Sequence, residues 1–195
     1  MVTMIGRSDS SLAPLLRRGL AVVFIGTEPG EESLRIGRYY ANPRNSFYAD
    51  LKKTGFTSVQ LTPEEDRRLL SRGIGLDDVY HDPDALQDRL ESIRPRAVCF
   101  NSKGALERYV GRKVSGEWRG AAARKHARLP IECVIWAIPD SSGSACRFHG
   151  ERLRLLRDLK RKLLKRALER ESALVGSDSL EALETLERLE DKLPW

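Results

Sequence analysis

Three apolar segments of the chain have the pattern of buried β-strands. They span residues 21–25, 97–100 and 131–138, and each is a nearly continuous apolar run rather than an alternation of apolar and polar positions. Strands that are apolar on both sides are covered on both faces, as in a parallel sheet packed between two layers of helices. The pattern therefore predicts an α/β fold, a three-layer sandwich with a central, mostly parallel sheet.

Signals for the start of helices lie between these segments. Residues 62–65 (Thr-Pro-Glu-Glu) supply an N-cap, a first-turn proline and a capping-box glutamate. Asp82 and Pro83 open a second helix, whose apolar residues recur at helical spacing as Leu86, Leu90 and Ile93. In a doubly wound sheet, ligands bind beyond the carboxyl ends of the strands, so residues that directly follow a strand are candidates for a site.

A basic amphipathic helix is predicted after Gly150. Leucines recur there among lysines and arginines, and we interpret the basic side as a solvated outer face rather than a contact surface for nucleic acid. An acidic stretch with regularly spaced leucines begins after Ser177. Because 195 residues suit one domain with a buried core, we predict a single domain over residues 1–170. Residues 171–195 are expected to form an acidic amphipathic helix packed on the domain or on a partner chain.

Composition and charge narrow the classes of protein that fit. The net charge of +6 and the pI near 9.4 suit a polyanionic partner, although many soluble proteins are mildly basic. No apolar run approaches the roughly 20 residues of a membrane span, and the start of the chain does not resemble a secretion signal. We therefore expect a cytoplasmic protein with no membrane contact.

Cysteine and histidine are too few and too scattered to predict a metal centre. The three cysteines, Cys99, Cys133 and Cys146, are odd in number and widely spaced, which fits reduced thiols rather than a disulfide framework. The three histidines are far apart, and an iron–sulfur cluster would need about four thiolates. We expect neither a metal nor an organic cofactor.

A turn rich in glycine and proline follows the first apolar segment. It reads Gly26-Thr27-Glu28-Pro29-Gly30, and it places a carboxylate where a doubly wound sheet presents its ligand site. From this pentapeptide alone, a surface turn with a solvated glutamate is the simpler interpretation. Residues 37–48 combine aromatic, amide and arginine side chains without helical or strand periodicity. Such a loop can stack on a planar ring and hydrogen-bond its edges, or it can simply pack as an aromatic loop.

Together these segments resemble a known family. Residues 22–48 resemble motif one of uracil-DNA glycosylases, closest to the mismatch-specific uracil/thymine branch, in which a strand runs into Gly-Ile-Asn-Pro-Gly before a Pro-x-Asn-x-Phe-Trp stretch. Residues 55–57, 73–75 and 94–103 are also similar to that branch. Residues 139–148 resemble the second motif, the loop that enters the DNA minor groove. The resemblance covers about residues 20–165 in collinear order and implies the three-layer fold of that family.

The resemblance also implies roles for individual residues. Tyr40 would stack on the flipped base, Asn101 would read the pyrimidine edge, and Ser141 and Ser142 would hold phosphates and the abasic sugar. The implied substrate-binding residues are Gly26, Thr27, Pro29, Gly30, Tyr40, Asn45 and Asn101. The implied DNA-binding residues are Lys103, Ser141, Ser142, Gly143, Ser144 and Arg147.

Two positions, Glu28 and Ser144, depart from the mismatch-specific branch, and Gly30 differs only from the uracil-specific branch. Glu28 stands where the mismatch-specific branch has the asparagine that positions the water, but the classical branch has an aspartate there, so Glu28 is the expected catalytic carboxylate. Ser144 stands where relatives place a leucine or arginine wedge, and Arg147 or Phe148 would have to substitute for it. Gly30 replaces the tyrosine that excludes a 5-methyl group in the uracil-specific branch.

The resemblance therefore implies a monofunctional DNA-repair glycosylase that removes uracil, or another damaged or mismatched base, and leaves an abasic site. We expect it to act as a monomer on DNA that contains uracil or a mismatch, in the bacterial cytosol or nucleoid, or in the nucleus of a eukaryote. Two alternatives stay open. A related branch acts on hypoxanthine and also has Tyr-Tyr followed by Pro-Arg-Asn, which favours a glycosylase for deaminated purines. The change to Glu28 and the absence of a wedge favour a non-catalytic module that binds damaged DNA.

Overall fold

A four-stranded parallel sheet forms the centre of the molecule. The computed structural model describes residues 11–80, 82–127, 129 and 132–175. Within them, the strand order is β2-β1-β3-β4, and every neighbouring pair is parallel. The strands are β1 (Val22–Gly26), β2 (Ile74–Asp78), β3 (Ala97–Phe100) and β4 (Val134–Ala137). The predicted α/β fold is confirmed. β2 is absent from the sequence-based prediction, because a glycine and two aspartates interrupt its apolar pattern.

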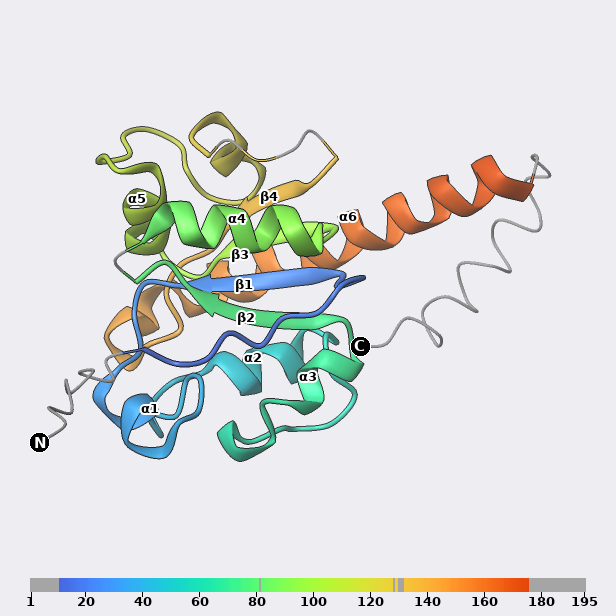
Figure 1. The fold of residues 1–195 in the computed structure, drawn as a ribbon. Helices are drawn as coiled ribbons and strands as arrows, with labels where there is room; N and C mark the ends of the chain where they lie inside the picture. The colour runs from blue at the N-terminus through green and yellow to red at the C-terminus, as the bar shows by residue number, and fades with distance from the viewer. Residues whose placement is uncertain (1–10, 81, 128, 130–131, 176–195) are drawn as a thin grey trace, which may run out of the picture.

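Helices cover both faces of the sheet (Figure 1). On one face lie α2 (Phe47–Lys53), α3 (Arg68–Ser71) and α6 (His149–Val175). On the other face lie α4 (Pro83–Ile93) and α5 (Lys103–Val110). The shorter elements are α1 (Glu31–Ile36) and the 3₁₀ turns η1 (Pro63–Glu65), η2 (Ala121–Lys125) and η3 (Gly143–Phe148). The three layers are therefore helix, sheet and helix, as the sequence predicts.

The alternation of side chains along β1 divides the core into two parts. Val22 and Phe24 belong to the cluster shared with α2 and α6, whereas Val23 and Ile25 belong to the cluster shared with α4 and α5. All four side chains are completely buried. Because successive residues of a strand face opposite sides, a strand with helices on both faces needs apolar residues at every position. The strands therefore appear in the sequence as uninterrupted apolar runs.

The two predicted helix starts have different outcomes. Asp82 is the N-cap of α4, and its Oδ1 accepts a hydrogen bond from the Ala85 amide at 2.8 Å. Residues 62–65 do form the predicted capping box, with the Thr62 amide donating to Glu65 Oε2 at 3.1 Å. This capping box opens the single 3₁₀ turn η1 rather than a long helix, and α3 begins separately at Arg68.

The predicted basic amphipathic helix is α6. Its leucines at positions 156, 159 and 163 are buried against the sheet, whereas Arg154 and Arg157 are exposed, which matches the solvated outer face expected from the sequence. α6 continues without a break across residue 170, the predicted end of the domain. Most of the predicted acidic helix, residues 176–195, lies outside the described residues. None of the described helices is both long and apolar enough to cross a membrane.

Candidate functional site

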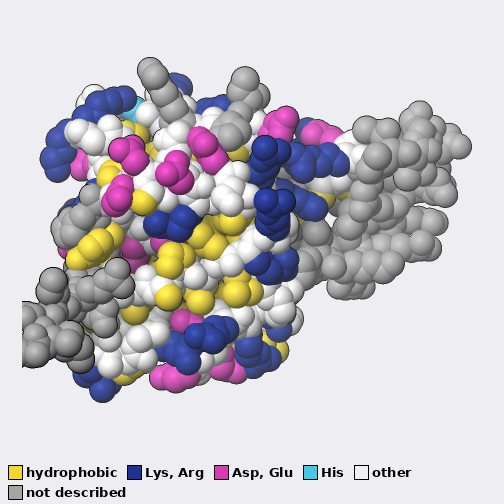
Figure 2. Space-filling view, in the orientation of Figure 1, with side chains coloured by type: hydrophobic (Ala, Val, Ile, Leu, Met, Phe, Trp, Pro, Cys, Tyr) yellow, Lys and Arg dark blue, Asp and Glu magenta, His cyan; other side chains and the backbone are white. Residues whose placement is uncertain are grey.

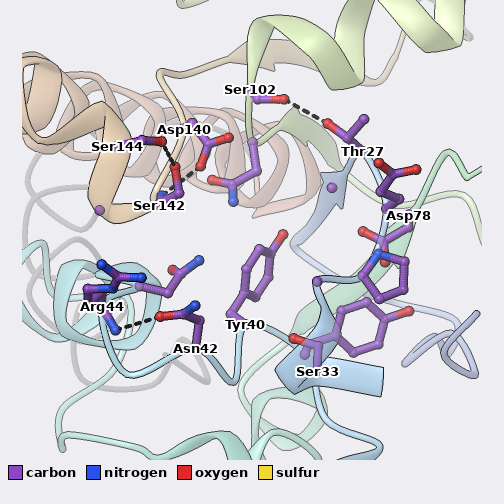
Figure 3. Close-up of a pocket in the computed structure, with 18 of the residues that line it drawn as sticks. Thr27, Ser33, Tyr40, Asn42, Arg44, Asp78, Ser102, Asp140, Ser142 and Ser144 are labelled. Atoms are coloured by element: carbon purple, nitrogen blue, oxygen red, sulfur yellow. Dashed lines mark hydrogen bonds between the residues drawn. The ribbon is translucent and has the colours of Figure 1, made fainter. Parts of the chain in front are cut away.

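A cavity of about 570 Å³ opens at the carboxyl ends of the strands, within the range of ligand-binding pockets. The register of the sheet brings together the residues that form the floor of the cavity. Gly26 of β1 pairs with Asp78 of β2, and Ile25 of β1 pairs with Phe100 of β3, which directly precedes Asn101. Three strand ends thus meet at one level, where a parallel sheet presents its ligand site. Figure 3 shows this cavity, with the Tyr40 ring between Asp78 and Thr27 on one side and Ser142 and Ser144 on the other.

Most of the residues expected from the sequence converge on this cavity. The lining residues that were expected are Gly26, Thr27, Glu28, Pro29, Gly30, Tyr40, Asn45, Asn101, Ser142, Gly143 and Ser144. Ser141 is buried beside Asn101 and does not line the cavity. Lys103 and Arg147 do not line it either: Lys103 forms an exposed ion pair with Glu107, and Arg147 stacks its guanidinium on Phe148. Their predicted contacts with DNA stay predictions.

Tyr40 holds its ring in the cavity by an unusual backbone conformation. Its φ of 55° lies in the left-handed region, which is rare for a bulky side chain and is found at sites that require it. The ring stacks on Phe47, with centroids 4.0 Å apart and planes 21° apart. The Tyr40 hydroxyl is buried, and burial raises the pKa of Tyr40 well above its usual value, although a hydrogen bond with the Asn101 side chain acts in the opposite direction. The ring is therefore a rigid, neutral aromatic surface at the cavity wall.

A buried guanidinium fixes the orientation of the Asn101 amide. Arg152 on α6 is 1% exposed, and its Nη1 donates to Asn101 Oδ1 at 2.6 Å and to the Pro139 carbonyl at 2.7 Å. Since the amide oxygen of Asn101 accepts from Arg152, its amide nitrogen must be the group that donates. One of its hydrogens goes to Ser141 Oγ at 3.1 Å. The cavity thus receives a donor rather than an acceptor from Asn101.

Asp50 completes this buried cluster and neutralises Arg152. The Asp50 side chain is fully buried, and its Oδ2 accepts from Arg152 Nε at 2.7 Å. His149 Nε2 and Ser46 Oγ also contact the Asp50 carboxylate, each at 2.7 Å. The cluster ties α6 and α2 to the floor of the cavity. Sequence reasoning missed it, because Arg152 belongs to a run of basic residues that otherwise face solvent.

The loops that contain the two family motifs contact each other beside the cavity. The Ser46 amide donates to the Ser141 carbonyl at 2.9 Å. At Gly143, an added Cβ would lie 3.2 Å from Arg44 Cβ, so the glycine permits close packing of the two loops. Ser144 hydrogen-bonds Ser142 through their hydroxyls at 2.9 Å and stays within its own loop. Ser144 is too small to act as a wedge, and the Arg147–Phe148 pair presents the larger surface of η3.

Three carboxyl groups surround the cavity, and they differ in exposure. The Glu28 side chain is 52% exposed and forms an ion pair with Arg108 at 3.0 Å. Asp140 is also exposed, and its Oδ1 accepts from the Ser142 amide at 2.6 Å. Asp78 is buried, and its burial, together with the charges of Asp77 and Glu28, raises its pKa to about 7. Sequence reasoning identified Glu28 alone. The two consecutive aspartates at the end of β2 could have identified Asp78 as a site residue. The sequence did not predict β2 as a strand, so this position was missed.

The wall of the first cavity is open near Gly30. A Cβ added at Gly30 would meet nothing within 4 Å, so there is open space directly beside Gly30.

The surface charge around α4 is uneven. Figure 2 shows acidic side chains over α4 and basic ones at its end. Arg94, Arg96 and Arg170 line a second cavity there, where β3 begins, at the opposite end of the sheet from the first cavity. Among the described residues, no three His, Cys, Asp or Glu side chains are grouped as metal ligands would be.

Two comparisons show which known proteins the chain is similar to. The family model for the uracil DNA glycosylase superfamily matches residues 14–166 of the chain. The chain is also similar to the solution NMR structure of a protein described as a putative uracil DNA glycosylase from Methanosarcina acetivorans. The TM-score is 0.50 at 22% sequence identity, over 78% of this chain and 98% of that one. At this identity, the structural likeness bears on the fold.

Proposed function

The chain belongs to the uracil-DNA glycosylase superfamily, and from that membership we propose that it hydrolyses the N-glycosidic bond of uracil in DNA and leaves an abasic site. The observation that carries the proposal is the cavity at the strand ends. A fixed aromatic ring (Tyr40), an amide held as a donor (Asn101) and a carboxylate at the rim (Glu28) face the same space. A base that leaves the DNA stack needs a ring to stack on and partners for its edge.

The different exposure of the three groups supports their assignment to different parts of a flipped nucleotide. A base that enters the cavity would place its ring at the buried floor, beside Tyr40 and Asn101, and its sugar at the rim. Glu28 is at that rim, more than half exposed, where water reaches it. Glu28 is therefore the carboxylate placed to act on the sugar, and the deeper groups are placed to act on the base.

In the proposed reaction, the bond between C1′ and the base nitrogen breaks as water adds to C1′. The sugar gains positive charge in the transition state, and the Glu28 carboxylate stabilises that charge and accepts a proton from the water. The base leaves with the bonding electrons as an anion, which solvent then protonates. The Asn101 amide donates toward the negative charge of the departing base. We propose that the protein performs this reaction as a monomer in the cytoplasm, without a cofactor.

A panel of labelled oligonucleotides tests the proposed function. The protein, prepared in a host without its own uracil-DNA glycosylase, is incubated with DNA that carries uracil or hypoxanthine, single-stranded and opposite each base, and then treated with alkali. We expect strand scission at uracil. Because the wall at Gly30 is open, thymine opposite guanine belongs in the panel as well. Scission at hypoxanthine alone would favour a purine glycosylase, and binding to damaged DNA without any scission would favour a non-catalytic module.

Replacement of Tyr40 by leucine is expected to weaken binding of a flipped uracil by about 1–3 kcal/mol, the usual contribution of one base stacked on an aromatic ring. The measurement is the affinity for DNA that contains a cleavage-resistant 2′-fluoroarabino-uridine, relative to the same DNA without uracil. Tyr40→Phe is the matched control, because it keeps the ring and removes only the hydroxyl group. Equal affinities for Tyr40→Leu and Tyr40→Phe would show that Tyr40 does not stack on the base.

A further inference from the structure

Asp78 is a carboxyl group on the cavity floor that neither the family motifs nor the proposed reaction uses. It is the last residue of β2 and is 8% exposed, and its Oδ2 is buried with no hydrogen-bond partner in the described part of the chain. Figure 3 shows Asp78 beside the cavity with its carboxyl group on the side of the Tyr40 ring. An unpartnered buried oxygen at a cavity wall is a costly feature that a ligand would satisfy.

Gly26 makes room for this carboxyl group. A Cβ added at Gly26 would lie 2.0 Å from Asp78 Oδ1, closer than any real contact, so the oxygen occupies the space that a side chain at position 26 would fill. The same Cβ would lie 3.4 Å from the Tyr40 hydroxyl. Asp78 Oδ1, Gly26 and the Tyr40 hydroxyl are therefore adjacent on the floor of the cavity. A base stacked on Tyr40 would present its edge to Asp78.

Burial favours the neutral form of Asp78, and the acidic groups around it favour that form further. Asp77 precedes it on β2 and is engaged by Arg89 on α4, with Nε 2.8 Å from Oδ2. Glu28, after β1, is engaged by Arg108 on α5 at 3.0 Å. Tyr39 and Tyr40 lie in the loop before α2, where burial raises the pKa of each and the charge of Asp78 raises both further. Among the described residues, Asp78 itself forms no ion pair.

A neutral carboxyl group has one donor and one acceptor side by side, whereas a carboxylate has acceptors only. Uracil presents a matching edge, because a carbonyl oxygen lies next to the N3–H group. We propose that Asp78 reads this edge as a neutral acid, donating its hydroxyl proton to a base carbonyl and accepting from the adjacent ring N–H. The inference rests on the proposed function and extends it to a substrate class: bases in which a carbonyl adjoins a ring N–H, which uracil, thymine and hypoxanthine share.

The affinity of a neutral Asp78 for the base should depend on pH in a defined direction. Ionisation of Asp78 removes the donor and places negative charge against a carbonyl oxygen, so binding weakens as pH rises through the pKa of Asp78, about 7. Above that pH, the affinity for the base falls by about tenfold per pH unit, in step with the neutral fraction. Asn at this position carries a donor and an acceptor at every pH. Asp78→Asn should therefore bind the base and lose the pH dependence.

The experiment measures binding without cleavage. The probe is duplex DNA with one 2′-fluoroarabino-uridine, and its affinity is divided by that of the undamaged duplex at each pH, from about pH 5.5 to about pH 8.5. The ratio should fall above pH 7 for the wild type and stay level for Asp78→Asn. Asp77→Asn should move the fall to lower pH, because the charge of Asp77 raises the pKa of Asp78. Asp88→Asn, an exposed position on α4, should leave it unchanged.

A second probe and a stability measurement test the hydrogen bond and the titration of Asp78 separately. A methyl group on N3 of the uracil removes the ring N–H, so this probe should lose the pH-dependent preference. The raised pKa also means that, between about pH 4 and about pH 7, the native state holds a proton that the unfolded chain has released. The free energy of unfolding therefore falls as pH rises over this range. The melting temperature of Asp78→Asn should decline less than that of the wild type, because only the contribution of Asp77, whose pKa burial also raises, remains. This result would show that the variant is folded and that Asp78 titrates as described.

The outcomes separate this inference from the proposed function. A level ratio for the wild type, or the same fall in Asp78→Asn, overturns the role of Asp78 while excision of uracil stands. Binding of the uracil probe that depends on Asp78, without excision on any substrate, overturns the glycosylase proposal while the role of Asp78 stands. The N3-methyl probe binding as well as uracil would also overturn the role of Asp78.

Discussion

Replacement of Arg152 by methionine is expected to lower the free energy of unfolding by about 3 kcal/mol, the lower end of the cost of breaking a buried ion pair. Arg152 is 1% exposed and Asp50 is fully buried, so the variant leaves a buried carboxylate without its guanidinium. The oxygens of Asn101 and Pro139 also lose their donor. The loss of free energy of unfolding stays near the lower end of the usual range because His149 and Ser46 continue to contact Asp50. The measurement is urea unfolding at neutral pH.

Two further variants make this result interpretable. Arg157→Met makes the same change on the exposed side of α6, and its effect should be within about 0.5 kcal/mol of zero. Asp50→Leu combined with Arg152→Met leaves no buried charge, so the double variant should recover part of the loss. An unfolding midpoint that Arg152→Met leaves unchanged would contradict the assignment of the cluster as a structural support for the cavity floor.

The second large effect concerns the rate of reaction. Replacement of Glu28 by glutamine is expected to slow single-turnover excision of uracil by about 10²–10⁴-fold, the usual contribution of a positioned acid or base. Glutamine keeps the shape of the side chain, but it can neither accept a proton from water nor stabilise the positive sugar. Binding of the 2′-fluoroarabino probe should change little, because Glu28 is at the rim and the base is held at the floor.

Glu31→Gln is the matched control for this variant. Glu31 is exposed in the first turn of α1 and is not among the residues that line the cavity. The variant removes the same charge three residues further along the chain, so it corrects for the general effect of charge on DNA binding. If Glu28→Gln excised uracil as fast as the wild type, the assignment of Glu28 as the base would be wrong, and Asp78 and Asp140 would be the remaining carboxyl groups of the cavity.

The sequence predicts the parts of this fold whose cause is local. β1, β3 and β4 are recognisable because burial on both faces requires an apolar residue at every position. α4 is recognisable because Asp82 caps it and its leucines recur at helical spacing. β2 escapes this reasoning. Asp77 and Asp78 are tolerated in it, because Asp77 pairs with Arg89 on α4 and Asp78 faces the cavity, and the local apolar pattern shows neither.

For the candidate site, the order of residues along the chain was enough to name most of the cavity. Gly26 to Gly30, Tyr40 and Asn101 follow strands or lie in the aromatic loop, so their place at the strand ends follows from the fold class. Only the tertiary structure shows what each side chain faces. It places Arg152 under Asn101, Arg108 beside Glu28, and the unpartnered Asp78 on the floor. The protonation and orientation of a polar group depend on its burial and its neighbours, and these are set by contacts between segments far apart in the sequence.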